Sequence, residues 1–183
     1  MKRFVRNIVL GSLLVTVLMS CNQGPTLQSY IVDNQESNNF TTIDLPVSVV
    51  SFDESKLTAD QKAAYHSVKR LNFLGYRLQK GNEAEYNAEM AEVKSILKDK
   101  KYHELMRMGN NEDGKIAIKY LGTEHQIDEL IVFGNANNQG FGILRVLGDG
   151  MQPDKMVKLI NALKNADVNI DEGQLKGIAD FFK

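Results

Sequence analysis

Apolar residues recur along the chain with two spacings, one typical of helices and one typical of strands. The clearest helical pattern lies in residues 83–99, where Tyr86, Met90, Val93 and Leu97 follow one another at intervals of four, three and four residues. Residues at these intervals share one face of an α-helix, so the stripe predicts a helix that packs one side against a core.

The helical spacing recurs in three other segments near the ends of the folded part. A short helix is predicted after residue 26, another opens at Pro153, and a weaker one lies at the carboxyl end. Their apolar stripes consist of Leu27, Tyr30 and Ile31; of Met156, Leu159, Ile160 and Leu163; and of Leu175, Ile178 and Phe182.

Polar residues mark the starts of two helices. Thr58 and Gln61 fit a capping box, in which the Thr hydroxyl and the Gln amide satisfy backbone groups that the first helical turn leaves unpaired. This pair predicts a helix over residues 59–68. Asn82 and Glu85 stand in the same relation at the start of the helix predicted above.

Segments rich in β-branched and aromatic residues, bounded by Gly, Asn or Pro, predict strands. The second of them is apolar at most positions, which is typical of a strand buried on both faces. The predicted strands are residues 40–45, 71–78, 102–108, 115–121, 130–134 and 141–147.

Short polar connections join the last four strands, at residues 109–114, 122–129 and 135–140. Connections of this length join antiparallel neighbours, so these strands are predicted to form a meander. With helices before and after the strands, the sequence predicts an α+β fold in which an antiparallel meander sheet is packed with helices in two layers.

The amino terminus has the pattern of an export signal. Residues 1–7 are positively charged, residues 8–19 are almost wholly apolar, and Ser20 adds a small residue. Twelve residues of helix span about 18 Å, short of the ~30 Å hydrocarbon core of a bilayer. A removed signal at residues 1–20 is therefore favoured over a permanent transmembrane helix.

Leu18-Met19-Ser20-Cys21 resembles the lipobox of bacterial lipoproteins, in which the cysteine is acylated and becomes the first residue of the mature chain. The resemblance implies lipidation of Cys21 and membrane attachment through that lipid; a leftover thiol after an ordinary signal peptide is the alternative. Residues 21–39 are then a lipid-anchored tether with a short helix, ahead of a single α+β domain at residues 40–183.

Residues 22–26 contain no acidic residue. By resemblance to known sorting signals, they lack both an Asp that retains lipoproteins in the inner membrane and the acidic signature of surface export. The expected location is the outer membrane, with the domain facing the periplasm. The inner membrane and the cell surface stay open as alternatives.

The formal net charge of −1 is unevenly distributed, because Lys2, Arg3 and Arg6 lie in a first stretch of twenty residues without any acid. Removing that stretch leaves 19 basic against 23 acidic residues, a net charge of −4. Such a chain has no basic footprint for a phosphate backbone, so nucleic acid is not an expected partner.

One cluster contains residue types that could bind a metal or transfer protons. Glu124, His125, Asp128 and Glu129 lie within six residues, and His103 is a further candidate. The cluster falls in a predicted strand connection and lacks the spacing of known zinc motifs, which favours solvated surface residues over a metal site. No catalytic residue and no cofactor are expected.

The segment from Lys69 to Leu163 resembles the domain-of-unknown-function 4252 family, small lipoproteins of Bacteroidetes. The resemblance implies no known enzymatic activity and no functional residues. It rests on residues 70–76, on the acidic helix that ends at Lys101, and on residues 102–106, 114–118, 127–130 and 143–150.

Three functions are compatible with these observations. The first is a non-enzymatic, lipid-anchored module that binds another envelope protein. The second is a metal-dependent or acid/base hydrolase that uses the cluster between Glu124 and Glu129. The third, an accessory factor in envelope-stress signalling, follows only from the family resemblance.

Overall fold

The computed structural model describes residues 24–50, 54–110, 114–136 and 139–165. The predicted export signal, Cys21 and the predicted helix that contains Leu175 and Phe182 lie outside these residues. Within the described ranges, no helix is long and apolar enough to cross a membrane.

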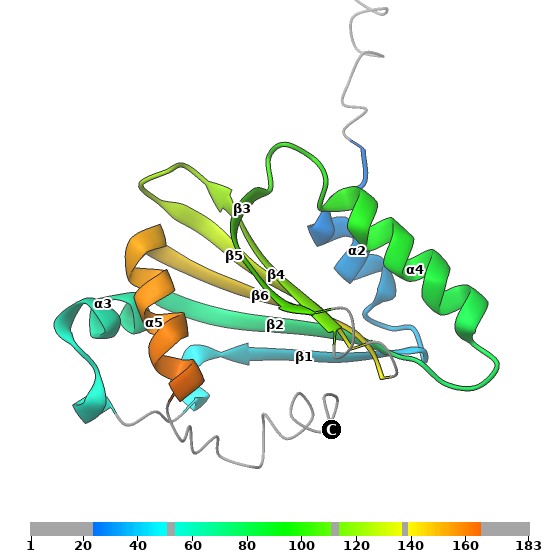
Figure 1. Cartoon of the computed structure of the whole chain (residues 1–183), viewed down its shortest axis with the longest axis horizontal. Coiled ribbons are helices and arrows are strands. Elements are labelled where there is room, and N and C mark those ends of the chain that lie inside the picture. Colours follow the sequence, from blue (N-terminus) through cyan, green and yellow to red (C-terminus); the bar gives the residue numbers. More distant parts are fainter. Residues whose placement is uncertain (1–23, 51–53, 111–113, 137–138, 166–183) are drawn as a thin grey trace, which may run out of the picture.

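Six strands form one antiparallel sheet (Figure 1). The last four strands of the chain follow one another as a meander, and the two earlier strands extend the sheet beyond β6. Two short 3₁₀ helices, η1 (Val47–Val49) and η2 (Glu54–Lys56), follow the first strand. In spatial order the strands are β1 (Phe40–Pro46), β2 (Val68–Arg77), β6 (Gly140–Met151), β5 (Ile127–Ala136), β4 (Gly114–Gly122) and β3 (His103–Asn110).

Helices pack against both faces of the sheet, two on each (Figure 1). One pair is α2 (Leu27–Asn34) with α4 (Glu83–Ile96); the other is α3 (Ala59–Ser67) with α5 (Pro153–Asn165). Leu130 is buried with α3 and α5, and its neighbour Ile131 is buried with α2 and α4, because successive side chains of a strand point to opposite faces.

The core beneath α2 and α4 is built largely on aromatic rings. Tyr76 of β2 stacks on Phe141 of β6, with ring centroids 5.7 Å apart and planes inclined by 8°. The Phe40 ring of β1 meets the Tyr76 ring edge-on, with centroids 5.0 Å apart, and the centroid of the Tyr86 ring of α4 lies 5.8 Å from that of Phe141. These rings fix α4 against the middle of the sheet.

Helix α2 belongs to the packed domain. Leu27 and Tyr30 are buried, and the Tyr30 hydroxyl donates a 2.7 Å hydrogen bond to Glu89 of α4. The short helix predicted within residues 21–39 is present, and packing extends from residue 27, ahead of the predicted domain start at residue 40.

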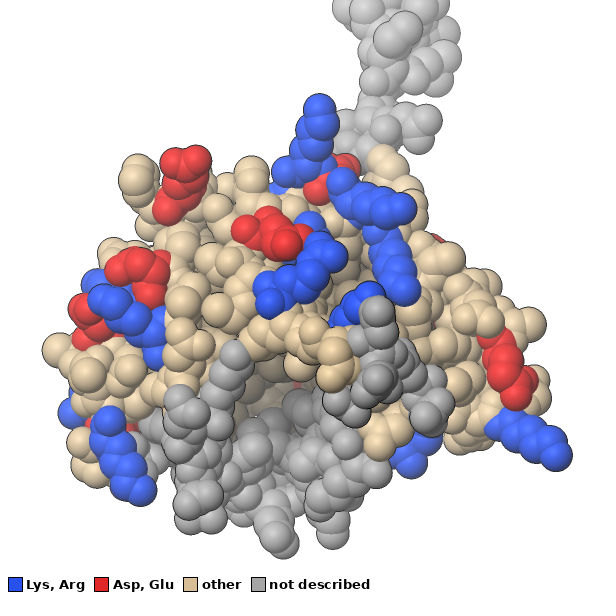
Figure 2. Space-filling model, in the orientation of Figure 1, with Lys and Arg blue, Asp and Glu red and all other residues tan. Residues whose placement is uncertain are grey.

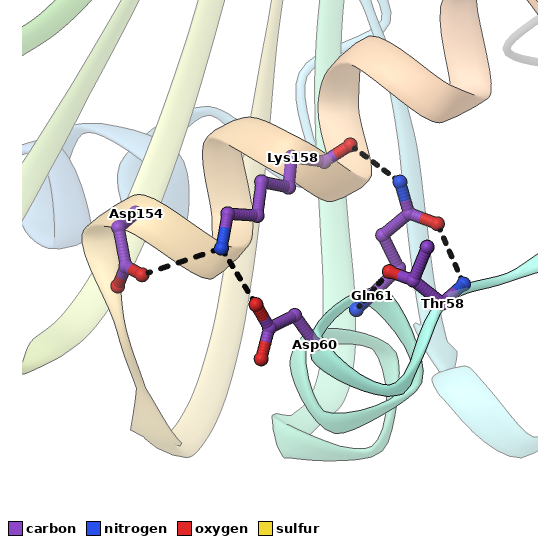
Figure 3. Close-up of polar contacts among 5 residues, drawn as sticks. All are labelled: Thr58, Asp60, Gln61, Asp154 and Lys158. Carbon is purple, nitrogen blue, oxygen red and sulfur yellow. Dashed lines mark hydrogen bonds and ion pairs between the residues drawn. The ribbon is translucent and has the colours of Figure 1, made fainter.

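Helices α3 and α5 are joined by polar contacts along their exposed sides (Figure 3). Lys158 Nζ lies 2.6 Å from an Asp60 oxygen, and the Gln61 side chain donates a 3.3 Å hydrogen bond to the Lys158 carbonyl. Gln61 also takes part in the predicted capping box with Thr58, in which both reciprocal hydrogen bonds are present. One cap residue therefore both starts α3 and holds it to α5.

The predicted α+β class, the antiparallel sheet and its four-stranded meander are confirmed, but helices cover both faces of the sheet, so the fold has three layers instead of the two predicted. Every predicted strand is present, and residues 73–76 of β2 are buried as its composition predicts. Strand β5 begins at Ile127 instead of residue 130, and β6 continues to Met151 instead of residue 147. The polar residues that bound these strands in the sequence lie within them, because ladder hydrogen bonds continue past the apolar stretch.

Two predictions about α4 are wrong in detail. Asn82 does not cap the helix with its side chain; its amide accepts from the Gln79 N–H and donates to the Arg77 carbonyl, which closes the preceding turn. The helix ends at Ile96 instead of residue 99, because the backbone tightens into turns closed by the N–H groups of residues 98 and 99.

Candidate functional site

The edge strand β3 offers the most open backbone of the sheet's meander. Among the described residues β3 pairs with β4 alone, and five of its eight residues are exposed. A shift of register between Glu104 and Met106 marks a β-bulge near the start of the strand. Bulges of this kind twist an edge and restrict which strands can pair with it.

One face of this edge is apolar. Met106 and Met108 are partly buried against the core beneath α3 and α5. Met108 lies opposite Ile116 of β4, whose side chain is 38% exposed. Met106, Met108 and Ile116 form what we name the β3 patch.

The other face of β3 carries charge. Arg107 forms an ion pair with Glu104, three residues away, and both side chains are exposed. The hydrogen bond from Arg107 holds the pKa of Glu104 below its usual range. The edge therefore presents an apolar side and a charged side to any strand that approaches it.

A buried ion pair lies farther inside the same sheet. Arg145 of β6 donates two hydrogen bonds to the Glu129 carboxylate of β5, Nε to Oε1 at 2.6 Å and Nη2 to Oε2 at 2.7 Å. Side-chain exposures of 6% and 10% leave both groups out of solvent. The two charges satisfy one another, so the pair holds β5 to β6 and offers no free group for catalysis.

The predicted cluster does not converge on one point. Glu124 and His125 are exposed in the connection between β4 and β5, where the backbone N–H of His125 donates a hydrogen bond to the Thr123 hydroxyl. Asp128 is exposed on β5, and Glu129 is bound to Arg145.

His103 is exposed at the start of β3, where its ring lies 5.2 Å from that of Tyr120. Within the part of the chain that the structure describes, no group of three His, Cys, Asp or Glu residues is arranged to hold a metal ion. Cys21, the predicted lipidation site, lies outside the described residues.

Sequence reasoning missed the β3 patch and the part played by Arg145. Both depend on strand register, which places Met108 beside Ile116 and Arg145 diagonal to Glu129. The only signal in the sequence was a pair of methionines at alternate positions of a predicted strand, which gives one apolar face but not its neighbours.

The geometry defines a small α+β domain with an antiparallel sheet between two helix pairs and an accessible sheet edge. The chain belongs to the family described as "Domain of unknown function (DUF4252)", whose model matches residues 30–159. The match covers every described strand and most of the four helices. No curated protein and no solved structure matches the chain.

Proposed function

We propose that the protein is a lipoprotein of the cell envelope, anchored by acylation of Cys21, that acts without catalysis by binding another envelope protein along β3. The observation that carries the binding role is the open edge of β3 beside the β3 patch. An extended segment of a partner can add to such an edge as a further strand.

The backbone and side chains of β3 would contribute differently to such a complex. Main-chain hydrogen bonds to β3 would supply much of the affinity, and alternate side chains of the partner would supply specificity. The charged pair Glu104 and Arg107 favours polar partner residues on its side of the sheet, whereas Met108 and Ile116 favour apolar ones. An amphipathic strand is therefore the chemistry that fits.

The anchor is supported by the run Leu18-Met19-Ser20-Cys21 after an apolar segment. The absence of acidic residues at positions 22–26 favours the outer membrane, with the domain facing the periplasm; an inner-membrane or surface position would be seen in fractionation. As a member of its family, the chain would belong with small Bacteroidetes lipoproteins. Neither catalysis nor a cofactor is needed for this role.

The anchor is tested by the variant Cys21→Ala and by globomycin, each followed by membrane fractionation. We expect the variant to leave the membrane fraction, and we expect globomycin to cause accumulation of the unprocessed chain. A variant that stays bound to membranes as firmly as the natural chain would contradict the proposed anchor.

The binding role is tested by placing a photoreactive phenylalanine at exposed Arg107 and crosslinking in intact cells. We expect an adduct of one discrete mass, absent when the same group is placed at exposed Lys80. Ile116→Lys should lower the yield of the Arg107 adduct by roughly tenfold, because a charge at an apolar contact costs about 1 to 2 kcal/mol or more.

Val32→Lys is the matched control for Ile116→Lys, since Val32 is also an exposed apolar residue, 47% accessible, on α2. The control should leave the adduct unchanged, and thermal unfolding should show that both variants fold. Binding along β3 would be contradicted if the adduct formed in equal yield from Arg107 and from Lys80. It would also be contradicted if Ile116→Lys left the yield of the Arg107 adduct unchanged.

A further inference from the structure

Four lysines gather where α4 ends and the chain turns toward β3. Lys94 lies in the last turn of the helix, and the connection adds Lys98, Lys100 and Lys101; all four are exposed. We name these four residues the basic end. Asp99 is the one acidic residue between positions 94 and 101, so this stretch has a net charge of +3.

The charges of the basic end remain available at the surface. Within the described part of the chain, none of the four lysines forms an ion pair with a carboxylate. Asp99 instead accepts a 3.0 Å hydrogen bond from the backbone N–H of Lys101. The Lys101 ammonium lies 5.2 Å from the centre of the Tyr102 ring, a cation–π contact that leaves its charge facing solvent.

The basic end is fixed beside the start of α2. The hydroxyl of Tyr102, the residue after Lys101, accepts a buried 2.9 Å hydrogen bond from the backbone N–H of Leu27. Figure 1 shows α2 beginning next to the connection from α4 to β3, and Figure 2 shows blue Lys and Arg side chains gathered over this end of the molecule. Helix α2 therefore begins beside the basic end.

A short tether keeps this end close to any membrane that holds Cys21. Five residues lie between Cys21 and Leu27, and a fully extended chain from Cys21 to Leu27 spans at most about 20 Å. The potential of a charged lipid surface decays over a Debye length of about 8 Å at physiological ionic strength. The tether therefore lets the basic end reach that surface while limiting how far the domain can move away.

The remaining charge favours the same orientation. Apart from the basic end and Asp99, residues 21–183 contain 15 basic and 22 acidic residues. An anionic surface would attract the basic end and repel the rest of the domain. The charge distribution thus selects one orientation as well as proximity.

We propose that the basic end is the membrane-facing surface of the domain and that it binds the anionic phospholipid headgroups of the leaflet that holds the acyl chains. The inference rests on the proposed acylation of Cys21 and adds the lipid class and the orientation of the domain. Because β3 begins at His103, directly after Lys101 and Tyr102, docking would hold the first residue of the edge strand near the bilayer and present the rest to a partner.

The test uses the acylated full chain incorporated into phosphatidylcholine vesicles with and without phosphatidylglycerol. The chain has no tryptophan, so Ser95→Trp places a single tryptophan, which can be excited apart from the tyrosines, on the exposed side of α4 within the basic end. Energy transfer from this Trp to a dansyl-labelled headgroup reports how close the basic end lies to the lipid surface. We expect stronger transfer with phosphatidylglycerol and a loss of the difference at high salt.

The charge-reversal variant Lys98→Glu, Lys100→Glu and Lys101→Glu should remove the phosphatidylglycerol effect. A lysine near an anionic surface contributes roughly fivefold to binding, so losing three lysines should lower the ratio of docked to undocked domain at least on the order of a hundredfold, and the added glutamates should lower it further. The matched control is Lys56→Glu, Lys80→Glu and Lys115→Glu, which changes the net charge equally at exposed positions elsewhere. The control should retain most of the effect.

Failure of the inference and failure of the anchor give different results. An acylated chain that floats with the vesicles but shows equal transfer in both lipid mixtures overturns the inference alone. Equal losses in the two triple variants also overturn it, because total charge and not the basic end would then govern docking. A chain whose mass shows no acylation at Cys21 overturns the anchor and the inference together.

Discussion

Arg145 and Glu129 form a doubly hydrogen-bonded ion pair inside the molecule, between neighbouring strands of the sheet. They are diagonal neighbours, since Glu129 lies opposite Leu147 and Arg145 lies opposite Ile131. Two parallel hydrogen bonds match the fork of the guanidinium to both carboxylate oxygens, which is the geometry that best offsets the cost of removing two charges from water.

We expect Arg145→Met to lower the free energy of unfolding by about 3 to 5 kcal/mol, because the variant leaves the Glu129 carboxylate buried without its partner. The double variant Arg145→Met with Glu129→Leu should lose less than the single variant, since no charge remains in the core. Urea unfolding of the two single variants and the double variant gives the coupling energy directly.

Arg70→Met is a matched control for the loss of an arginine. Arg70 also pairs with a carboxylate, Asp44, at 2.6 Å, but its side chain is 54% exposed. Exposed pairs contribute at most about 1 kcal/mol. If Arg145→Met cost no more than Arg70→Met, the buried pair would not have the structural role assigned to it.

The same pair shows what sequence patterns could predict. The periodicity of apolar residues located the strands and helices because burial repeats with the period of each element. It did not predict register or the face that each helix covers, since these depend on contacts between segments distant in the chain. Glu129 therefore looked like a member of a carboxylate and histidine cluster, whereas its partner Arg145 lies 16 residues away.

The candidate site was less predictable than the fold for a similar reason. Met106 and Met108 mark one face of a predicted strand, but the exposed Ile116 beside them comes from the next strand. Whether β3 lies at an edge follows from the order of all six strands, and no local pattern encodes that order. The basic end, by contrast, is visible in the sequence as a cluster of lysines, but its position beside Leu27 depends on the fold.

A second prediction concerns Gly148 of β6, where the backbone of another element approaches closely. A Cβ atom at this position would lie 2.3 Å from the Ser67 carbonyl oxygen at the end of α3 and 2.9 Å from Met151 Sδ. We expect Gly148→Ala to cost about 1 to 3 kcal/mol, because the backbone of α3 must move to accommodate it.

Gly134→Ala in β5 provides the comparison for Gly148→Ala. Its Cβ would lie 3.6 Å from the nearest atom, Ile116 Cγ1, an ordinary van der Waals contact. Thermal unfolding should therefore show a smaller effect for Gly134→Ala than for Gly148→Ala. The reverse order would mean that α3 does not pack as closely on β6 as the structure shows.

A third prediction concerns the cap of α3. The Thr58 hydroxyl accepts from the Gln61 N–H, and the Gln61 side chain accepts from the Thr58 N–H at 2.9 Å. We expect Thr58→Ala to reduce stability by about 1 kcal/mol and Thr58→Ser, which keeps the hydroxyl, to reduce it less. Urea midpoints measure both, and equal losses would show that the hydroxyl does not contribute to the cap.

The last prediction concerns Tyr76, whose side chain is fully buried and whose hydroxyl has no hydrogen-bond partner among the described residues. Burial raises the pKa of Tyr76 to about 12, and the nearby Glu85 carboxylate adds to the shift. The folded state thus disfavours the phenolate, whereas the unfolded chain ionises near the ordinary pKa of about 10. Tyr76 therefore stabilises the fold below pH 10 relative to higher pH, and this contribution is lost as the pH rises toward 12.

A shift of this size corresponds to a loss of about 3 kcal/mol across that range, and Tyr76→Phe should remove this part of the alkaline destabilisation. At pH 8 the variant should be as stable as the natural chain or more stable, because it also removes a buried hydroxyl without a partner. Urea unfolding at pH 8, 10 and 11 separates the two effects. Burial and Glu89 also raise the pKa of Tyr30, so the stability of the variant should still fall to some extent at high pH. A loss of stability at pH 8 would instead indicate that the Tyr76 hydroxyl is hydrogen-bonded in solution, with the Glu85 carboxylate that raises its pKa as the candidate acceptor.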